Sequence, residues 1–370
     1  MKTLNWYIAR DLLINTFLAV GILTFVMVSG NLFKVFELVA KGISPVVFGK
    51  FILLIVPEML RYTIPLSLLT GTVLLFSRLS ADNEITAMKA SGVSLWQIIA
   101  PALALAGVLS GLCFWLATSV GPRCRYAAEQ LMKTEAVRNP LALIEPGGFR
   151  EIPGYLIRVG VKDGDMLGDI HILAVDRKTG RPTKDITARR GRVRQDEERR
   201  VLNLQLEDAT FATIDLDGSV VEDHEQAVDR VAMSSIDLPI EYGAKLDAKP
   251  VTRKLKYMDF QSMLARIYFD TGTGENVTPH YVALHKRMSM ALSPISFLLI
   301  GIPFAIRNRR SETSIGLLLS LFLGFGFYVF LVLTDTMKDQ TAFHPEFLVW
   351  LPNVLYQGGG LWALARIEKH

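Results

Sequence analysis

The sequence predicts an α-helical membrane protein with six transmembrane helices and a water-facing, β-rich domain inserted between the third and fourth helices. Long apolar segments occur in two groups of three, and a helix of about 20 apolar residues is enough to cross a bilayer. The stretch between the groups, Arg123–Arg287, carries charges throughout and has no apolar segment of that length. The expected divisions of the chain are therefore 1–122, 123–287 and 288–370.

Five of the six predicted spans contain no Asp, Glu, Lys or Arg. They are Leu12–Phe33, Ala90–Pro122, Met288–Ile306, Thr313–Thr334 and Phe347–Ala365. The remaining span, Phe51–Ser77, is interrupted only by Glu58 and Arg61. Residues three apart share a helix face, and charges inside a span are costly unless they face protein or water. We therefore expect Glu58 and Arg61 to form an intramembrane ion pair near the outer end of this span, with a substrate contact as the alternative.

Lys and Arg near the span ends predict the orientation, because cytoplasmic segments of membrane proteins carry more of them. With the N-terminus inside, the cytoplasmic segments contain Lys2, Arg10, Arg78, Lys89, Arg307, Arg309, Arg310, Arg366 and Lys369. The outer loops contain Lys34, Lys41, Lys50 and Lys338. Both termini are therefore expected in the cytoplasm, and the inserted domain in the periplasm if the cell is Gram-negative.

Three lysines around the first outer loop run against this rule. Either the orientation tolerates them because more Lys and Arg lie on the inner side, or they bind a substrate that carries phosphates at the outer membrane surface. Lysine is a suitable point-charge partner for phosphate, and its attraction to an anionic surface contributes about 1 kcal/mol. On the second interpretation Lys34 and Lys41 are the candidate lipid-phosphate contacts.

The inserted block reads as a small antiparallel sandwich or roll between about residues 141 and 238. Its short β-branched or alternating runs are Tyr155–Gly160, Asp169–Val175, Val201–Leu206 and Ala209–Asp215, and turn-forming pairs separate them. Helical spacing predicts flanking helices over Arg123–Asn139 and Lys254–Asp270.

The cytoplasmic segment Ser80–Ser94 predicts a short helix. Ser80 is its expected N-cap, and Asp82 and Glu84 fall in a first turn where the helix dipole favours carboxylates. Ile85 and Met88 share one face, and a helix this short needs tertiary packing or a partner. The segment is either a connector or the contact through which a separate ATPase delivers force, because the chain has no G-x-x-x-x-G-K-[ST] motif of its own.

Composition argues against other classes of function. A net charge of +4 and the lack of a basic tract interleaved with aromatics exclude nucleic acid as a partner. The six histidines form no metal-binding spacing, no cofactor motif occurs, and no nucleophile–base arrangement suggests a hydrolase. The chain is therefore not expected to be an enzyme. Cys113 and Cys124 are expected to be free thiols.

Three motifs point to a family. They are the run Arg78–Ser94 (RLSADNEITAMKASGVS), His285-Lys286-Arg287 followed by an apolar run to Gly301-Ile302-Pro303, and Trp350-Leu351-Pro352-Asn353 at the last span. Together, and in this order, they resemble the lipopolysaccharide-export permeases of the LptF/LptG type, over essentially the whole chain. The resemblance leaves open which of the two paralogues this chain is.

This resemblance implies a permease subunit of an ABC transporter in the bacterial inner membrane, with a jelly-roll periplasmic domain. It implies four partners: a paralogous permease, a cytoplasmic ATPase dimer, a single-span periplasmic jelly-roll protein and lipopolysaccharide itself. It assigns the ATPase contact to the Ser80–Ser94 helix. It also implies lateral lipid entry between the first span of one permease and the fifth span of the other. The aromatic residues of those spans are candidates for the path, with plain packing as the alternative: Phe25, Phe322, Phe325 and Tyr328.

Two functions stay open at this point. The chain either extracts lipopolysaccharide and passes it to a periplasmic bridge towards the outer membrane, or it relays ATPase motion to its outer domain as a mechanotransmission or scaffold protein that moves no lipid. Lipid entry at the first or fifth span distinguishes them.

Overall fold

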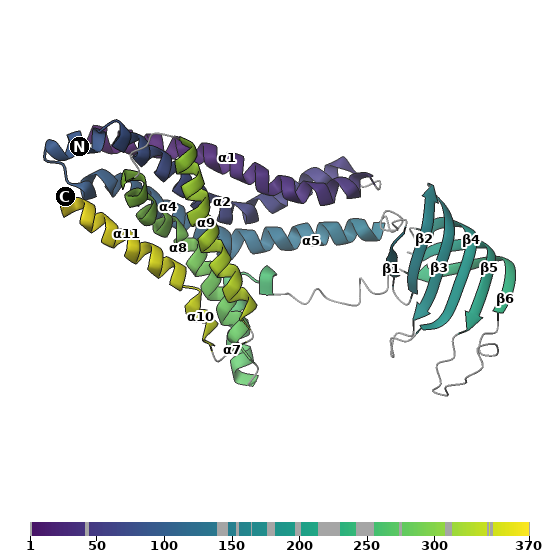
Figure 1. The fold of residues 1–370 in the computed structure, drawn as a ribbon. Helices are drawn as coiled ribbons and strands as arrows, with labels where there is room; N and C mark the ends of the chain where they lie inside the picture. The colour runs from purple at the N-terminus through teal and green to yellow at the C-terminus, as the bar shows by residue number, and fades with distance from the viewer. Residues whose placement is uncertain are drawn as a thin grey trace, which may run out of the picture. The chain divides into compact units, whose positions relative to one another are not determined.

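The protein is described by a computed structural model, shown in Figure 1. The structure describes residues 2–40, 44–138, 147–152, 155–163, 165–175, 182–196, 201–213, 230–241, 255–273, 276–307, 313–338, 340 and 343–369. The chain divides into two compact units. The membrane unit comprises Met1–Val35, Phe48–Glu129 and Arg253–His370, and the sheet unit comprises Phe36–Val47 and Gln130–Thr252. The two groups of apolar helices thus form one unit, which also takes in both ends of the block expected at 123–287.

The first half of the membrane unit is built from long helices. They are α1 (Lys2–Ala40), α2 (Pro45–Ala81), the short α3 (Glu84–Ala90), α4 (Leu95–Trp115) and α5 (Gly121–Arg138). A π-helical turn, Leu116–Val120, joins α4 to α5, so that one helical segment continues beyond the third predicted span. Pro57 and Pro65 lie inside α2 and Pro101 inside α4, where each removes a backbone hydrogen bond.

The second half begins with the 3-10 turn η3 (Leu255–Tyr257). It continues with α7 (Phe260–Thr273), α8 (Thr278–Arg307), α9 (Thr313–Thr336), α10 (Pro345–Leu348) and α11 (Leu351–Lys369). The expected helix Lys254–Asp270 is thus interrupted, because Asp259 caps a new helix: its carboxylate accepts a hydrogen bond from Ser262 N at 3.0 Å.

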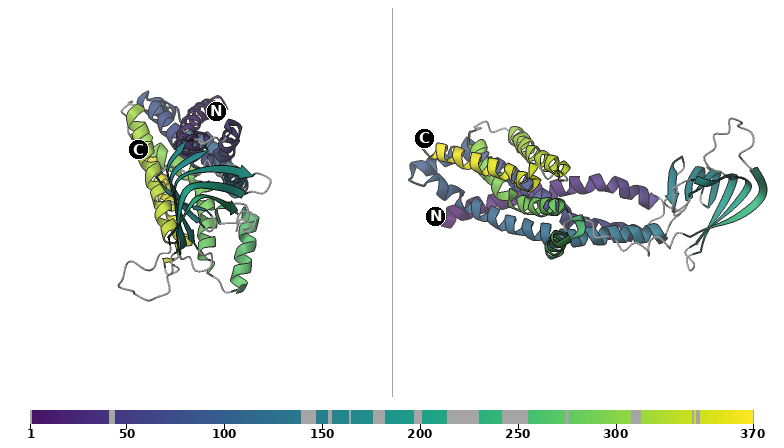
Figure 2. Two further views of the ribbon diagram at one scale, coloured as in Figure 1. Left: turned by 90° about the vertical axis from the view of Figure 1, so that its right-hand side faces the viewer. Right: turned by 90° about the horizontal axis from the view of Figure 1, so that it is seen from below.

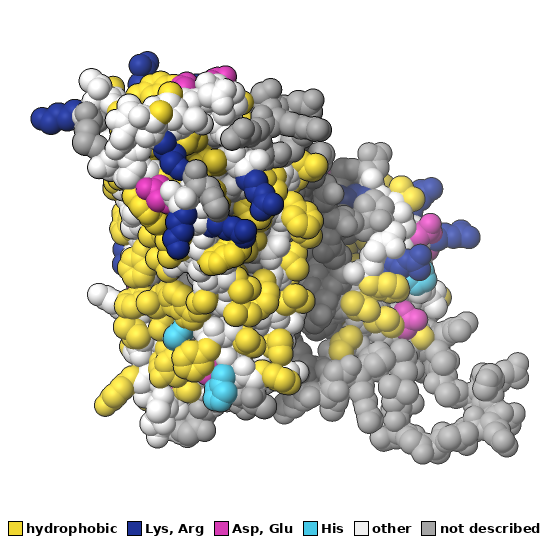
Figure 3. Space-filling view, turned by 60° about the vertical axis from the view of Figure 1, so that its left-hand side comes forward, with side chains coloured by type: hydrophobic (Ala, Val, Ile, Leu, Met, Phe, Trp, Pro, Cys, Tyr) yellow, Lys and Arg dark blue, Asp and Glu magenta, His cyan; other side chains and the backbone are white. Residues whose placement is uncertain are grey.

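The core of the membrane unit lies around α8, which packs against α4, α9 and α11 (Figure 1). Phe297 of α8 and Phe327 of α9 are both fully buried, and their rings meet edge to face at 4.9 Å. Outside this core the surface is apolar, and Figure 3 shows hydrophobic side chains covering much of one face. A water-soluble protein rarely exposes so large an apolar surface.

Five helical segments among the described residues are long and apolar enough to cross a membrane. They are Lys2–Gly30, Pro45–Ala81, Leu95–Met132, Thr278–Arg307 and Leu318–Thr336. The predicted sixth span corresponds to α11, which has 19 residues but is not among them. Its apolar character is diluted by Asn353, Gln357 and the glycines 358–360.

The sheet unit contains one six-stranded antiparallel sheet whose strands follow one another in sequence order. They are β1 (Phe149–Ile152), β2 (Tyr155–Asp163), β3 (Met166–Val175), β4 (Pro182–Asp196), β5 (Val201–Thr213) and β6 (Arg230–Glu241). Figures 1 and 2 show the sheet twisted and curved, as long antiparallel strands are. The described strands form this one sheet, so the second sheet that a sandwich requires is not found among them, and the expected jelly roll is not confirmed.

The expected strands correspond to β2, β3 and β5, whereas β1, β4 and β6 were not predicted from the sequence. The residues that face the sheet core alternate along the strands, as Ile157 and Val159 do on β2. In β4 the expected alternation is hidden, because arginines fill the outward positions between Ile186, Ala188 and Val193. The two strands expected at 201–206 and 209–215 are one strand, β5, with Asp208 in the left-handed region at φ 53°.

Candidate functional site

The first candidate site is the turn that joins α2 to α4 through α3. The helix α2 continues to Ala81, so Ser80 does not cap α3 as expected; its hydroxyl instead donates to the carbonyl of Ile306 at 2.9 Å. Asn83, at φ 56°, precedes the first residue of α3, Glu84, and Asp82 therefore lies in the turn before the helix. Gly92, at φ 88°, ends the segment in the left-handed conformation that glycine adopts without strain.

The start of α4 holds the other end of this turn in place. Ser94 Oγ accepts a hydrogen bond from Gln97 N at 3.3 Å, and Gln97 Oε1 accepts one from Ser94 N at 3.2 Å. This reciprocal capping box satisfies two backbone donors that would otherwise have no partner. The direction of the chain is thus set on both sides of α3 by local hydrogen bonds.

The apolar face of α3 points into the membrane unit. Ile85 is 5% exposed and belongs to its core, and Met88 packs against the same core. The exposed surface is formed by other residues, among them Asp82, Thr86 and the first-turn Trp96 of α4. The expected contact set Asp82, Glu84, Ile85 and Met88 is therefore divided between an exposed edge and a buried anchor.

Glu84 is linked to α1 and α2 through a chain of polar contacts. The Tyr7 hydroxyl donates to the Glu84 carboxylate at 3.4 Å and accepts from Arg78 Nη2 at 3.1 Å. Arg78 also pairs with Asp11 Oδ2 at 2.6 Å. Sequence reasoning missed Tyr7 and Asp11, because residues in different helices show no spacing that relates them.

The same turn contacts the C-terminal helix. Lys89 Nζ donates to the carbonyl of Ile367 at 3.1 Å, and Glu368 Oε2 accepts from the backbone N–H of Leu95 at 3.0 Å. The segment expected as a connector or a force-receiving contact thus touches α1, α8 and α11 at one end of the membrane unit. A displacement of α3 would act on both halves of the unit.

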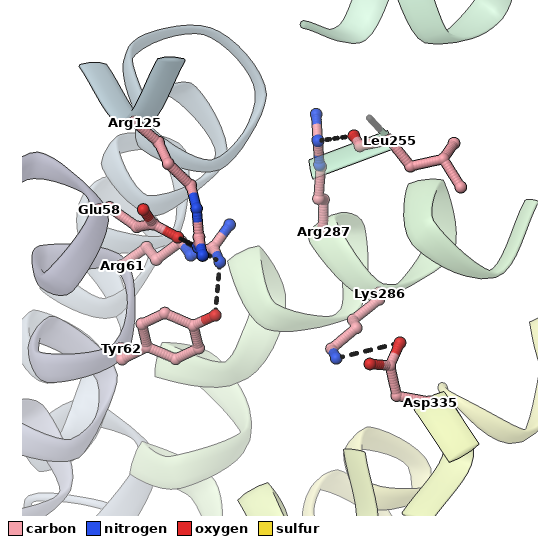
Figure 4. A network of polar contacts seen from close by, with 8 residues as sticks. All are labelled: Glu58, Arg61, Tyr62, Arg125, Leu255, Lys286, Arg287 and Asp335. Carbon is pink, nitrogen blue, oxygen red and sulfur yellow. Dashed lines mark hydrogen bonds and ion pairs between the residues drawn. The ribbon is translucent and has the colours of Figure 1, made fainter. Parts of the chain in front are cut away.

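The second candidate site is a charged cluster inside the membrane unit (Figure 4). Glu58 Oε1 lies 3.3 Å from Arg61 Nη2, and the Glu58 side chain is only 4% exposed. Arg125 of α5 reaches the same carboxylate oxygen, and Arg61 also bonds to the Tyr62 hydroxyl. One carboxylate thus serves two guanidinium groups, so the cluster carries a net positive charge. Sequence reasoning missed Arg125, which lies three residues beyond the third predicted span; the basic pair Arg123 and Arg125 just after this span was a signal that could have found it.

Arg287, from the expected His285-Lys286-Arg287 motif, lies close to this cluster and is 7% exposed. Its guanidinium donates to the carbonyls of Met258 at 2.5 Å and Leu255 at 3.0 Å. These carbonyls belong to η3 and the residue that follows it, so Arg287 ties the start of α8 to the chain that returns from the sheet unit. The preceding residue, Lys286, pairs with Asp335 of α9 at 3.4 Å.

Three of the four aromatic residues proposed for a lipid path lie on the surface. Phe25 of α1 is 70% exposed, and Phe322 and Phe325 of α9 are 74% and 66% exposed. Tyr328 instead faces the interior, where its hydroxyl donates to the carbonyl of Tyr62 at 2.7 Å. Lys41 and the side chain of Lys34 lie outside the described residues.

A comparison with known families connects these observations. A family model described as lipopolysaccharide export system permease LptF/LptG matches residues 6–366. No curated protein matches the chain.

Proposed function

Because the chain belongs to the lipopolysaccharide export system permease LptF/LptG family, we propose that it extracts lipopolysaccharide from the inner membrane and passes it to a periplasmic bridge towards the outer membrane. ATP is hydrolysed by a separate cytoplasmic ATPase dimer. The proposal rests mainly on the α3 turn. Thr86 of this turn is exposed, Ile85 is buried in the core, and the turn contacts helices from both halves of the membrane unit.

The proposed topology has six spans, with α11 as the sixth. At about 1.5 Å per residue, the 19 residues of α11 measure roughly 28 Å, which is close to the thickness of the hydrocarbon core. Its polar residues do not argue against a span, because they are satisfied inside the protein. Asn353 Nδ2 donates to Ser289 Oγ at 2.7 Å, and Gln357 Nε2 donates to Ser296 Oγ at 3.0 Å.

Both termini are proposed to be cytoplasmic and the sheet unit periplasmic. The α3 turn then lies on the cytoplasmic side, where an ATPase can reach it. Lys34, which the structure places in the last turns of α1, and Lys41 are proposed to lie on the outer side. The expected divisions 1–122, 123–287 and 288–370 describe the order of these parts along the chain.

In this proposal the residues of the α3 turn have separate roles. Asp82, Glu84 and the exposed Thr86 meet the ATPase, while Ile85 and Met88 transmit its displacement to the helices on which they pack. Glu84 belongs to both groups, because its carboxylate is held by Tyr7 of α1. Motion at the ATPase therefore reaches α1, which is one wall of the proposed lipid path.

Lipid entry is proposed along the exposed aromatic faces of α1 and α9. Phe25, Phe322 and Phe325 face outward and are free to meet acyl chains, whereas the half-buried Tyr328 packs against the core and bonds to α2. A second wall has to come from the paralogous permease, and a single-span protein with a jelly-roll domain receives the lipid outside. Lys34 and Lys41 remain the proposed partners for lipid phosphates.

Photo-crosslinking in living cells tests the function. A photoreactive amino acid at Phe322 is expected to trap lipopolysaccharide, and the same group at Trp362 of α11 serves as control because that side chain is also exposed, at 66%. Lipid adducts at 322 but not at 362 support transport. If neither position yields adducts while the ATPase still copurifies, the chain relays force without moving a lipid.

A further inference from the structure

The helix α7 buries one face and leaves an aromatic face exposed. Met263 and Ile267 are buried against Leu284 of α8. Leu264 and Tyr268 lie one helical turn apart on the outer side and are 44% and 85% exposed. Phe269, next to Tyr268, is 62% exposed. Nothing within the described residues covers these three side chains.

The first turn of α7 lies level with a membrane-spanning segment. The rings of Phe260 in α7 and Phe114 in α4 meet edge to face at 6.2 Å. Phe114 belongs to the span Leu95–Met132 and is itself 41% exposed. The exposed face of α7 is therefore continuous with the exposed surface of a helical segment that is long and apolar enough to cross a membrane.

Other aromatic side chains gather at the same end of the bundle. Tyr281 of α8 and Phe347 of α10 both pack against the ring of His285, and they are 38% and 68% exposed. Both α7 and α10 contact α8, and Figure 1 shows them at the same end of the membrane unit. Belts of exposed aromatic residues mark the level where a membrane protein passes from hydrocarbon to headgroups.

The polar side of α7 points away from the aromatic face. Arg266 Nε donates to Asp270 Oδ2 at 2.8 Å, and Asp270 is buried on the side that faces the protein, where His280 also approaches it. A helix with one aromatic face, one charged edge and modest length lies in the plane of the interface rather than across the bilayer.

We propose that α7 is an interfacial helix, which inserts Leu264, Tyr268 and Phe269 into the lipid leaflet at the end of the membrane unit where α8 begins. Its occupant is the bilayer itself and not a protein partner. The helix anchors the chain where it returns from the sheet unit to α8, next to Leu255 and Met258, whose carbonyls accept hydrogen bonds from Arg287. The proposal requires only that the chain spans a membrane, so it can fail or succeed independently of lipopolysaccharide transport.

Spin-label depth measurements on the full chain test the proposal. Cys113 and Cys124 are replaced by serine, and single cysteines at Tyr268, Leu264 or Arg266 carry a nitroxide in vesicles of phosphatidylethanolamine and phosphatidylglycerol. The accessibility to oxygen, divided by that to a water-soluble nickel chelate, rises with depth in lipid. Leu318 of α9, 68% exposed, is the lipid reference, and the exposed Arg190 of β4 is the water reference.

The ratios at 264 and 268 are expected to exceed that at 190 severalfold and to approach that at 318, with 266 between the two references. A ratio at 268 equal to that at 190 would overturn the proposal, because the side chain would then stand in water. Protection of 268 from both reagents would also overturn it, since a protein would then cover the face. Variants that lose the elution volume of the parent protein in detergent are replaced by Tyr268→Trp. The quenching of its fluorescence by lipid-bound bromine, measured as the difference from the parent protein with its five native tryptophans, reports the same depth.

Discussion

Asn353 and Ser289 meet inside the membrane unit, where the Asn353 amide donates to Ser289 Oγ at 2.7 Å and to the Ser289 carbonyl at 3.0 Å. Ser296 donates in turn to Asn353 Oδ1 at 2.5 Å. Asn353 is 2% exposed, so these bonds replace those that water would make. They join α8 to α11 and explain how a helix of low hydropathy is held in the bundle.

Replacing Asn353 by leucine is expected to destabilise the protein by about 1–2 kcal/mol, since interhelical hydrogen bonds in membranes contribute in this range and Ser289 and Ser296 lose the bonds that Asn353 makes to them. Unfolding in mixed micelles with increasing SDS measures the loss. Val354→Ala, at a neighbouring position that is 63% exposed, is the control. Equal stability of Asn353→Leu and the parent would mean that the hydrogen bonds between Asn353 and α8 do not contribute to the free energy of unfolding.

The run of three glycines in α11 contains a matched pair for a packing test. A Cβ at Gly360 would lie 2.5 Å from the carbonyl carbon of Leu299, whereas a Cβ at Gly358 meets nothing within 4 Å. Gly360→Ala is therefore expected to force α11 away from α8, at a cost of about 1–3 kcal/mol. Gly358→Ala is expected to leave stability unchanged or raised, because alanine favours the helix. Equal midpoints of thermal unfolding for both variants would contradict the close crossing.

Glu58→Gln is expected to destabilise the protein by about 3 kcal/mol, because it leaves Arg61 and Arg125 without their shared counter-charge in a buried place. The loss of stability is not expected to be larger, because the Arg125 side chain is 39% exposed and water can solvate its charge. Glu129→Gln breaks the exposed pair with Lys256, 3.6 Å apart, and should cost less than about 1 kcal/mol. A similar cost for both changes, measured by unfolding in detergent, would show that the cluster is hydrated.

The cap of α7 should depend on pH. Hydrogen bonds from Ser262, and then the Arg123 guanidinium, hold the pKa of Asp259 below its usual value of 3.8. Because the folded pKa is lowered, this stabilisation is fully present above that value and is lost as pH falls through the lower, folded pKa. A nitroxide at the exposed Gln261 should become more mobile below about pH 4. Asp259→Asn retains an acceptor but not the charge, so its spectrum should not change there.

The exposed edge and the buried anchor of α3 should respond differently to substitution. Thr86→Arg is expected to reduce copurification of the ATPase at least tenfold with unchanged thermal stability, because Thr86 is exposed. Ile85→Ala is expected to cost about 2–4 kcal/mol of stability, since it removes a side chain that is 5% exposed. Glu84→Ala should weaken association or uncouple hydrolysis from transport. Full ATPase binding by Thr86→Arg would place the contact elsewhere.

Much of the membrane part could be predicted because its signals are local. The lengths of the apolar segments, the terminator Gly92 and the i,i+3 spacing of Glu58 and Arg61 are visible in short windows of sequence. The fold of the inserted block was harder to predict, because arginines on β4 hide its alternation and strand pairing depends on which hairpins close. The role of Ser80 was misjudged because its partner, the carbonyl of Ile306, is 226 residues away.

The sequence alone identified a multi-pass membrane protein and a family motif between the second and third predicted spans. These follow from hydrophobic length and from local residue order. The packing of the helices established three further features: Ile85 faces the core, Arg125 shares the carboxylate of Glu58, and the buried Asn353 is hydrogen-bonded to α8. The reason is physical: burial and ion pairing depend on which distant helices pack together, and no local pattern specifies that choice.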